Sequence, residues 1–212
     1  MRRRRGRAAR VFAQVPVKQG ATSRPAALGR GELESYSRLA SELAGAEVVV
    51  ATGSARSEVA IGLATVAVAA GRRVALLEAD LGAPSLAGML GLAPVPGLHE
   101  YLRGEVEALA VLQPLVLAGP ASGSATEPLA CIVAGEPGPD ATPLLDSERF
   151  RGAVEGLRAS YDLLVVDGLP LDAELLGLIA LAEVADASIA CGPSGELPRR
   201  LPVPVTGLVL TV

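Results

Sequence analysis

The chain has 212 residues, enough for one domain of ordinary size with a substantial core, and half of them are apolar. Ala, Val and Leu supply most of this apolar mass while tryptophan is absent, which is typical of buried parallel strands covered by helices. The formal net charge is −4, but residues 1–30 hold nine Lys or Arg and no acid, which leaves ten basic against 23 acidic residues in the rest. The acidic body argues against a nucleic-acid-binding domain, and no apolar stretch reaches the ~20 residues needed to cross a bilayer.

Residues 1–30 are predicted to be a flexible basic tail, because they lack periodicity and contain Pro16, Gly20 and Pro25. A basic tail on an acidic body is either a solvated leader or a means of binding an anionic membrane surface through charge. No apolar core follows the arginines, so this is not a secretory signal. The remaining residues, 31–212, are expected to form one domain. We expect a cytoplasmic protein, either free or peripheral to the membrane.

Apolar periodicity divides the body into alternating strands and helices, which predicts a mostly parallel sheet with helices on both faces. In chain order the predicted elements are a helix at 31–44, a strand at 48–50, a helix at 59–70, a strand at 74–77, short helical pieces to about 105, two strands within 107–135, helices at 143–145 and 147–159, a strand at 161–167, a helix at 173–184 and strands at 187–191 and 206–212. From Ala46 to Asp80 the order is strand, loop, helix and strand. Such a loop points the N–H groups and dipole of a helix at the edge of the sheet, a site that usually binds phosphate.

Two cysteines, Cys131 and Cys191, lie in apolar runs 60 residues apart and are predicted to be buried free thiols. They lack metal-ligand spacing, and the chain holds a single histidine, His99. A metal–thiolate site is therefore not expected.

Four segments resemble, in order and at matching spacing, the motifs of one family. They are ESYSRLASEL (34–43), GRRVALLEADLGAPSLAGMLGL (71–92), PGLHEYLRGE (96–105) and the long run at 131–170 that ends in YDLLVVDGLP. They are similar to the EAYRxLRTNL, GKRVLLIDADLRRPxLHxxFGL, GLSDxLxGE and YDxVIIDTPP motifs of the bacterial tyrosine autokinases of capsule and exopolysaccharide synthesis. That family lies within the Min/Par-type deviant-Walker ATPases. The resemblance covers about residues 32–191 and implies an α/β fold, a three-layer P-loop NTPase-like domain at 31–212.

The resemblance also implies ATP and Mg²⁺ as cofactors and assigns the site residues. The phosphate-binding loop falls on Gly53, Ser54, Ala55, Arg56, Ser57 and Glu58. The catalytic acids fall on Glu78, Asp80 and Asp167, and the metal ligands on Ser57, Asp80 and Asp167. We expect the strands that carry these acids to lie at the centre of the sheet and to end at the loop. Asp167 should then lie within ~10 Å of Ser57, the reach of one hydrated metal ion.

Several residues of the site depart from the family. Ala55 adds a Cβ where glycine allows close backbone approach, and Arg56 keeps the charge of the family's lysine but not its compact ammonium. Glu58 stands where the family has a hydroxyl; it suits the helix dipole but repels a polyphosphate. Gly82 replaces the arginine of the second acidic motif. We therefore expect ATP binding to be weak or absent and tyrosine phosphorylation to be undetectable.

Residues for self-assembly and self-phosphorylation are also missing. The family's oligomerising E-x-x-R-x-x-R pattern reads Glu34, Ser37 and Ala40 here, so ring-forming self-association is not expected. The C-terminal tyrosine cluster that the family autophosphorylates is not found in the sequence up to Val212. If the chain is complete, we expect it to have no tail that could serve as a substrate for autophosphorylation.

The sequence predicts a degenerate tyrosine-kinase-like P-loop protein, a regulatory or binding module in polysaccharide assembly. Its expected partners are a membrane polysaccharide co-polymerase or a transmembrane activator, and, through residues 1–30, an anionic membrane surface. Two alternatives stay open, an active ATP-dependent kinase or ATPase of the same family and a Min/Par-like localisation factor. In a third, a Rossmann dinucleotide binder, Gly53 would open the turn and Glu78 would hold a ribose hydroxyl. The Rossmann G-x-G-x-x-G motif would need glycine at the positions of Ala55 and Glu58, which argues against this alternative.

Overall fold

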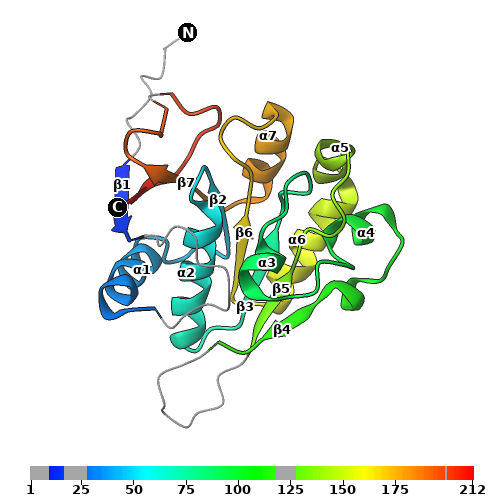
Figure 1. The fold of residues 1–212 in the computed structure, drawn as a ribbon, viewed down its shortest axis with the longest axis horizontal. Coiled ribbons are helices and arrows are strands. Elements are labelled where there is room, and N and C mark those ends of the chain that lie inside the picture. Colours follow the sequence, from blue (N-terminus) through cyan, green and yellow to red (C-terminus); the bar gives the residue numbers. More distant parts are fainter. Residues whose placement is uncertain (1–9, 17–27, 118–127, 199) are drawn as a thin grey trace.

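The computed structural model describes residues 10–16, 28–117, 128–198 and 200–212. Its strands form one eight-stranded sheet in the order β1-β8-β7-β2-β6-β3-β5-β4, in which only the pairing of β4 with β5 is antiparallel (Figure 1). The strands are β1 (Arg10–Val15), β2 (Val48–Thr52), β3 (Val74–Glu78), β4 (Gln113–Leu115), β5 (Leu129–Ile132), β6 (Leu163–Asp167), β7 (Ala187–Pro193) and β8 (Gly207–Thr211). The helices are α1 (Arg30–Glu42), α2 (Arg56–Ala69), α3 (Leu86–Leu90), α4 (Leu98–Arg103), a 3₁₀ turn η1 (Ala108–Val111), α5 (Ala141–Leu145), α6 (Glu148–Ser160) and α7 (Leu175–Val184).

The sheet is covered on both faces, which confirms the predicted three-layer α/β architecture. One core lies between the sheet and α1, α2 and α3, and the other between the sheet and α4, α5, α6 and α7 (Figure 1). The three strands β2, β6 and β3 are adjacent, and every residue in them is buried. Their sequences are almost wholly apolar for this reason, since a strand with helices on both sides has no solvent-facing position.

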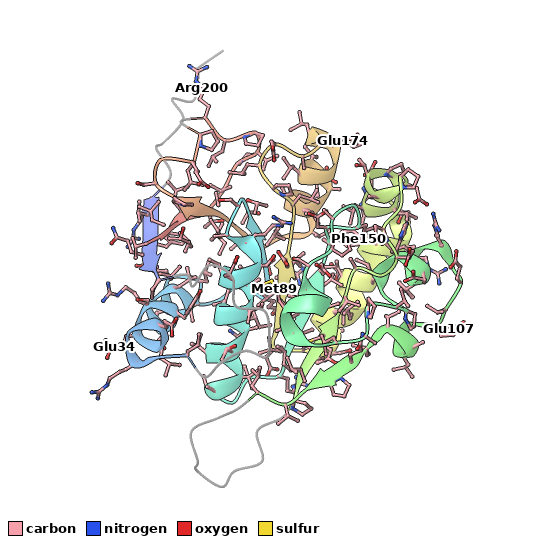
Figure 2. All side chains as sticks on the ribbon, in the orientation of Figure 1. Glu34, Met89, Glu107, Phe150, Glu174 and Arg200 are labelled. Atoms are coloured by element: carbon pink, nitrogen blue, oxygen red, sulfur yellow. The ribbon has the colours of Figure 1, made fainter. Side chains whose placement is uncertain are left out.

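Helix α6 illustrates how local sequence places an element. Ser147 is its N-cap, and the Ser147 hydroxyl accepts the Phe150 amide at 3.1 Å, as the sequence predicts. Phe150 and Val154 are fully buried against the sheet, and Figure 2 shows Phe150 in the interior while Glu34 points outward from α1.

The prediction of a flexible tail at 1–30 is wrong for Arg10–Val15, which form the edge strand β1. This strand pairs in parallel with β8, and the side chains of Ala13 and Val15 are buried in the core that α1 covers. The strand sequence RVFAQV is only six residues long and lies between an arginine-rich segment and Pro16. Because the flanking charge and proline are typical of a flexible tail, the strand was not predicted. At its other end the predicted tail overlaps α1, which begins at Arg30. Residues 1–9 and 17–27 of the tail lie outside the described residues.

Both cysteines are buried and free, as predicted. His99 is also buried; its Nδ1 contacts the Glu136 carbonyl, and its Nε2 lies 2.9 Å from Oδ1 of Asp140, the N-cap residue of α5. None of the helices in the described ranges has the length and apolar character needed to span a bilayer.

Candidate nucleotide-binding site

The predicted phosphate-binding loop lies at the carboxyl ends of the central strands. Strand β2 ends at Thr52, the loop follows, and α2 begins at Arg56. In the sheet register Asp167 lies beside Ala51 on one side and beside Glu78 on the other. The convergence of these strands on the loop is therefore confirmed.

Gly53 is required by the packing of the loop on β7. Its φ of +107° belongs to the left-handed region, and a Cβ at this position would lie 2.2 Å from the carbonyl oxygen of Cys191. The Gly53 amide donates to the Leu169 carbonyl at 3.1 Å, and the Ala55 amide donates to the Cys191 carbonyl at 3.4 Å. Two amides of the loop are thus bound to protein carbonyls.

Arg56 stands at the position of the family's lysine, and its guanidinium fills the space between the loop and the acids. Nη2 donates to Oδ2 of Asp80 at 2.6 Å, Nε donates to the Gly168 carbonyl at 3.0 Å, and Nη1 donates to the Gly53 carbonyl at 3.3 Å. Nε also lies 3.6 Å from Oδ1 of Asp167. Only 13% of the Arg56 side chain is exposed, so a partly desolvated cation joins the ends of three strands.

Asp167 is buried in the site without a hydrogen-bond partner among the described residues. Its side chain is 1% exposed, and among the described residues neither carboxylate oxygen has a hydrogen-bond partner with good geometry. Burial raises the pKa of Asp167 from 3.8 to about 7, against the opposing effects of the nearby Ser57 hydroxyl and the Arg56 guanidinium. The predicted separation of less than ~10 Å between Asp167 and Ser57 stays a prediction, and the neighbour of Ser57 in the loop, Arg56, lies 3.6 Å from Asp167.

Glu78 is turned toward other elements. It is fully buried, and its Oε1 accepts the amides of Ser85 and Leu86 while its Oε2 accepts the Ala134 amide at 3.0 Å. These bonds join β3 to the start of α3 and to the end of β5. Both oxygens of this predicted catalytic acid thus accept backbone amides of neighbouring elements.

The remaining loop residues point in different directions. The exposed Ser54 hydroxyl donates to Oε2 of Glu196 at 2.8 Å, and Oγ of Ser57 lies 3.3 Å from Oγ of Ser85. The half-buried Glu58 forms no ion pair within the described part of the chain. Helix α2 has Ala55 as its N-cap and no side-chain cap, so the amides of its first turn keep an anion-binding character.

A divalent cation does not fit this arrangement of side chains. Oδ2 of Asp80 is bound by Arg56, and Oδ1 accepts the Ala83 amide at 3.0 Å. Magnesium needs oxygen ligands in octahedral geometry, and the guanidinium occupies the space between the two acids that would supply them. Within the described ranges, no group of three or more His, Cys, Asp or Glu side chains is arranged to hold a metal ion.

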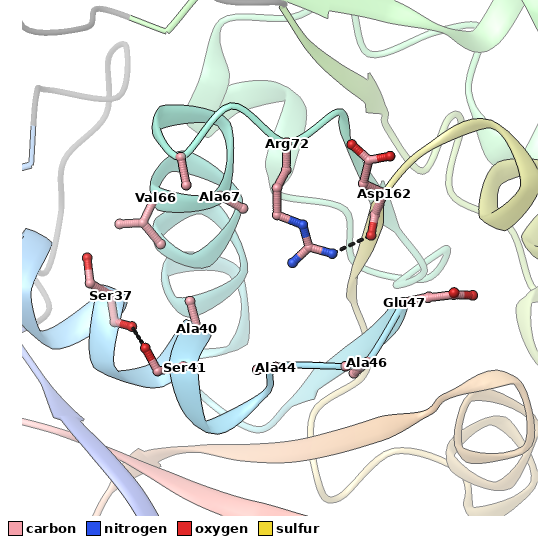
Figure 3. Close-up of a pocket in the computed structure, with 12 residues that line it drawn as sticks. Ser37, Ala40, Ser41, Ala44, Ala46, Glu47, Val66, Ala67, Arg72 and Asp162 are labelled. Atoms are coloured by element: carbon pink, nitrogen blue, oxygen red, sulfur yellow. Dashed lines mark hydrogen bonds between the residues drawn. The ribbon is translucent and has the colours of Figure 1, made fainter.

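The face of α1 that holds Ser37 and Ala40, where the family has its oligomerising arginines, borders a shallow groove. Ser37 and Ala40 line a hollow of about 540 Å³ between α1 and α2, together with small residues such as Ala44 and Ala67 (Figure 3). Figure 3 shows Arg72 at this hollow, where it donates to the Asp162 carbonyl. The positions of the two family arginines therefore present small side chains.

Comparison with known proteins shows which proteins the chain is similar to. No family model matches it. It is 32% identical over 168 residues to the Succinoglycan biosynthesis transport protein ExoP of Rhizobium meliloti (strain 1021), a match that covers 75% of this chain and 20% of ExoP. It is 25% identical over 149 residues to the Tyrosine-protein kinase CpsD of Streptococcus pneumoniae, which covers 70% of this chain and 61% of CpsD. The chain thus spans only part of both relatives.

Solved structures share its whole architecture. The BceF tyrosine kinase domain superimposes with a TM-score of 0.75 at 21% identity and covers 96% of this chain and 93% of that domain. The kinase domain of the Escherichia coli tyrosine kinase ETK gives 0.77 at 20% identity, with 96% and 90% covered. The chain belongs to the bacterial tyrosine kinase family. Its fold is the P-loop NTPase-like fold, since the septum site-determining protein MinD of Pyrococcus horikoshii also matches, with a TM-score of 0.53.

Sequence reasoning named the candidate residues of this site but missed the contacts among them. The bond between Arg56 and Asp80 was not predicted either, although both residues were named as candidates. No sequence signal marked Glu196 as the partner of Ser54, or Ser85 as the neighbour of Ser57.

Proposed function

We propose that the chain is a degenerate member of the bacterial tyrosine kinase family that acts by binding in polysaccharide assembly. The observation that carries this proposal is the position of Arg56, whose guanidinium is bound to Asp80 and to two carbonyls where the family binds phosphate and metal. Glu58 adds an anion to the first turn of the same helix. Both features act against a bound polyphosphate, so ATP use is weak or absent.

The relatives indicate where such a module works. ExoP is named for succinoglycan transport and CpsD for tyrosine kinase activity. We infer that this chain acts at the cytoplasmic face of a membrane complex, with a polysaccharide co-polymerase or transmembrane activator as partner. Its arginine-rich segment at 1–10 adds charge attraction to an anionic surface, which predicts liposome binding that weakens as salt is raised.

Two observations favour the alternative of an active kinase or ATPase. Ser57, Asp80 and Asp167 are retained, and the Asp167 carboxylate is buried with no hydrogen-bond partner among the described residues, as expected for a group that awaits a ligand. A localisation factor of the Min type is compatible with the fold alone. The Rossmann alternative is disfavoured, because Glu78 is fully buried and both of its carboxylate oxygens already accept backbone amides.

An activity assay separates the proposal from the kinase alternative. The purified chain is incubated with Mg-ATP and a tyrosine-containing polymer, alone and with the candidate co-polymerase, and phosphotyrosine and ADP are measured. The proposal predicts neither product above the level of an Asp80→Ala control, with the co-polymerase still bound. ADP or phosphotyrosine that the Asp80→Ala substitution removes would establish the alternative.

A further inference from the structure

The guanidinium of Arg56 lies between the loop and the ends of β3 and β6. Its donors reach a carbonyl of the loop at Gly53, a carbonyl beyond β6 at Gly168 and a carboxylate beyond β3 at Asp80. Carbonyl dipoles and carboxylates directed at one point are the surroundings of a bound cation. Here the cation belongs to the chain itself.

The charges at this point require a cation. The side chains of Asp80 and Asp167 are 9% and 1% exposed, and a buried carboxylate is costly unless it is paired. Arg56 is the cation that meets both, at 2.6 Å from Asp80 and 3.6 Å from Asp167. A divalent cation placed between the same acids would repel the guanidinium and compete with it for Oδ2 of Asp80.

We infer that the Arg56 guanidinium replaces the divalent cation of this site and keeps the loop attached to the ends of β3 and β6 without metal or nucleotide. The inference rests on the proposed function and adds a structural cause for it. Because a residue of the chain holds the loop closed, the shape of the loop does not depend on binding and hydrolysis of a nucleotide. A partner that recognises the closed loop would find it at all times.

Thermal unfolding in the absence of nucleotide tests this directly. The wild type, Arg56→Gln and Arg56→Ala are unfolded in EDTA and in millimolar Mg²⁺ or Mn²⁺, with Arg103→Ala as a control that removes an exposed arginine paired with Asp140. We expect the unfolding temperatures of the wild type and of the control to be the same with and without metal. Both Arg56 variants should unfold at a lower temperature in EDTA and regain roughly 3–6 °C when metal is present at about ten times its Kd.

A second variant makes the result specific to the site. Adding Asp167→Asn to Arg56→Gln should abolish the response to metal, because one of the two acids is then neutral. The inference fails if metal stabilises the wild type, or if folded Arg56→Gln gains nothing from metal. If the Arg56→Ala protein does not fold, Arg56→Gln, which keeps a polar side chain, carries the test. The experiment contains no ATP, so its failure is distinguishable from a failure of the proposed function, which concerns catalysis.

Discussion

The ring of Tyr36 in α1 lies directly on Gly62 in α2, and its hydroxyl donates to the Glu58 carbonyl at 3.2 Å. A Cβ at Gly62 would lie 2.2–2.5 Å from three ring carbons, closer than any real contact allows. Helix α1, in which Ser37 and Ala40 stand where the family has its oligomerising arginines, is thereby joined to the first turn of α2, the helix that follows the predicted phosphate-binding loop. Glycine inside a helix, normally a cost, is here what permits the contact.

Gly62→Ala is therefore expected to destabilise the protein. Alanine normally gains about 1 kcal/mol over glycine in a helix, but overpacking of a buried contact costs about 1–3 kcal/mol, and we expect the second effect to dominate. Chemical denaturation checks this, with Gly152→Ala in α6 as the matched control. Nothing lies within 4 Å of a Cβ at Gly152, so that variant should be stabilised. Equal gains in the two variants would contradict the Tyr36 contact.

Asp167→Asn is expected to remove a pH dependence. The folded-state pKa of Asp167 is raised to about 7 by burial, so the native state binds its proton more tightly than the unfolded state. The Asp167 contribution to stability therefore falls as pH rises from about 4 through about 7 and is then constant. The free energy of unfolding, measured for both proteins at pH 5 and pH 8, should favour the asparagine variant at pH 8 by on the order of 1–4 kcal/mol, and by less at pH 5. A difference that does not change with pH would refute the assignment.

Asp80→Asn is expected to cost about 3 kcal/mol, because it leaves Arg56 partly buried beside a neutral side chain. In a double-mutant cycle with Arg56→Gln the two losses should not add, since both break the same pair. Glu148→Gln, which breaks the exposed pair with Arg151 at 3.1 Å, is the control and should cost less than 1 kcal/mol. Additive losses at Arg56 and Asp80 would mean that the pair contributes no coupling.

Glu78→Gln tests whether this residue is structural. The amide nitrogen of glutamine would face at least one of the three backbone N–H groups that the carboxylate now accepts, leaving a buried donor unsatisfied at a cost of about 1–3 kcal/mol. The melting temperature should therefore fall, whereas Glu155→Gln on the exposed surface of α6 should leave it unchanged. An unaltered melting temperature for Glu78→Gln would return Glu78 to the list of candidate catalytic acids.

Much of this fold could be predicted because its signals are local and repeated. The strands β2, β3 and β6 follow from buried apolar runs, and their meeting point follows from the rule that parallel strands end at one edge. β1 could not be found so easily, because its pairing with β8 joins residues almost 200 positions apart and its flanks look like a tail. The candidate site residues could be named from the sequence. Their partners could not, since a side chain as long as that of Arg56 has several acceptors within reach and only packing selects among them.

Calorimetry with Mg-ATP tests the central claim most directly, on the wild type and on an Ala55→Gly, Arg56→Lys, Glu58→Thr triple variant that restores the family's loop. At an effective dielectric of ~20, the like charge of Glu58 at ~6 Å from a phosphate costs on the order of 2–3 kcal/mol, roughly a hundredfold in affinity. The account predicts no measurable heat for the wild type at micromolar nucleotide and a gain of about a hundredfold or more in the variant. Micromolar binding by the wild type, with no gain in the variant, would contradict it.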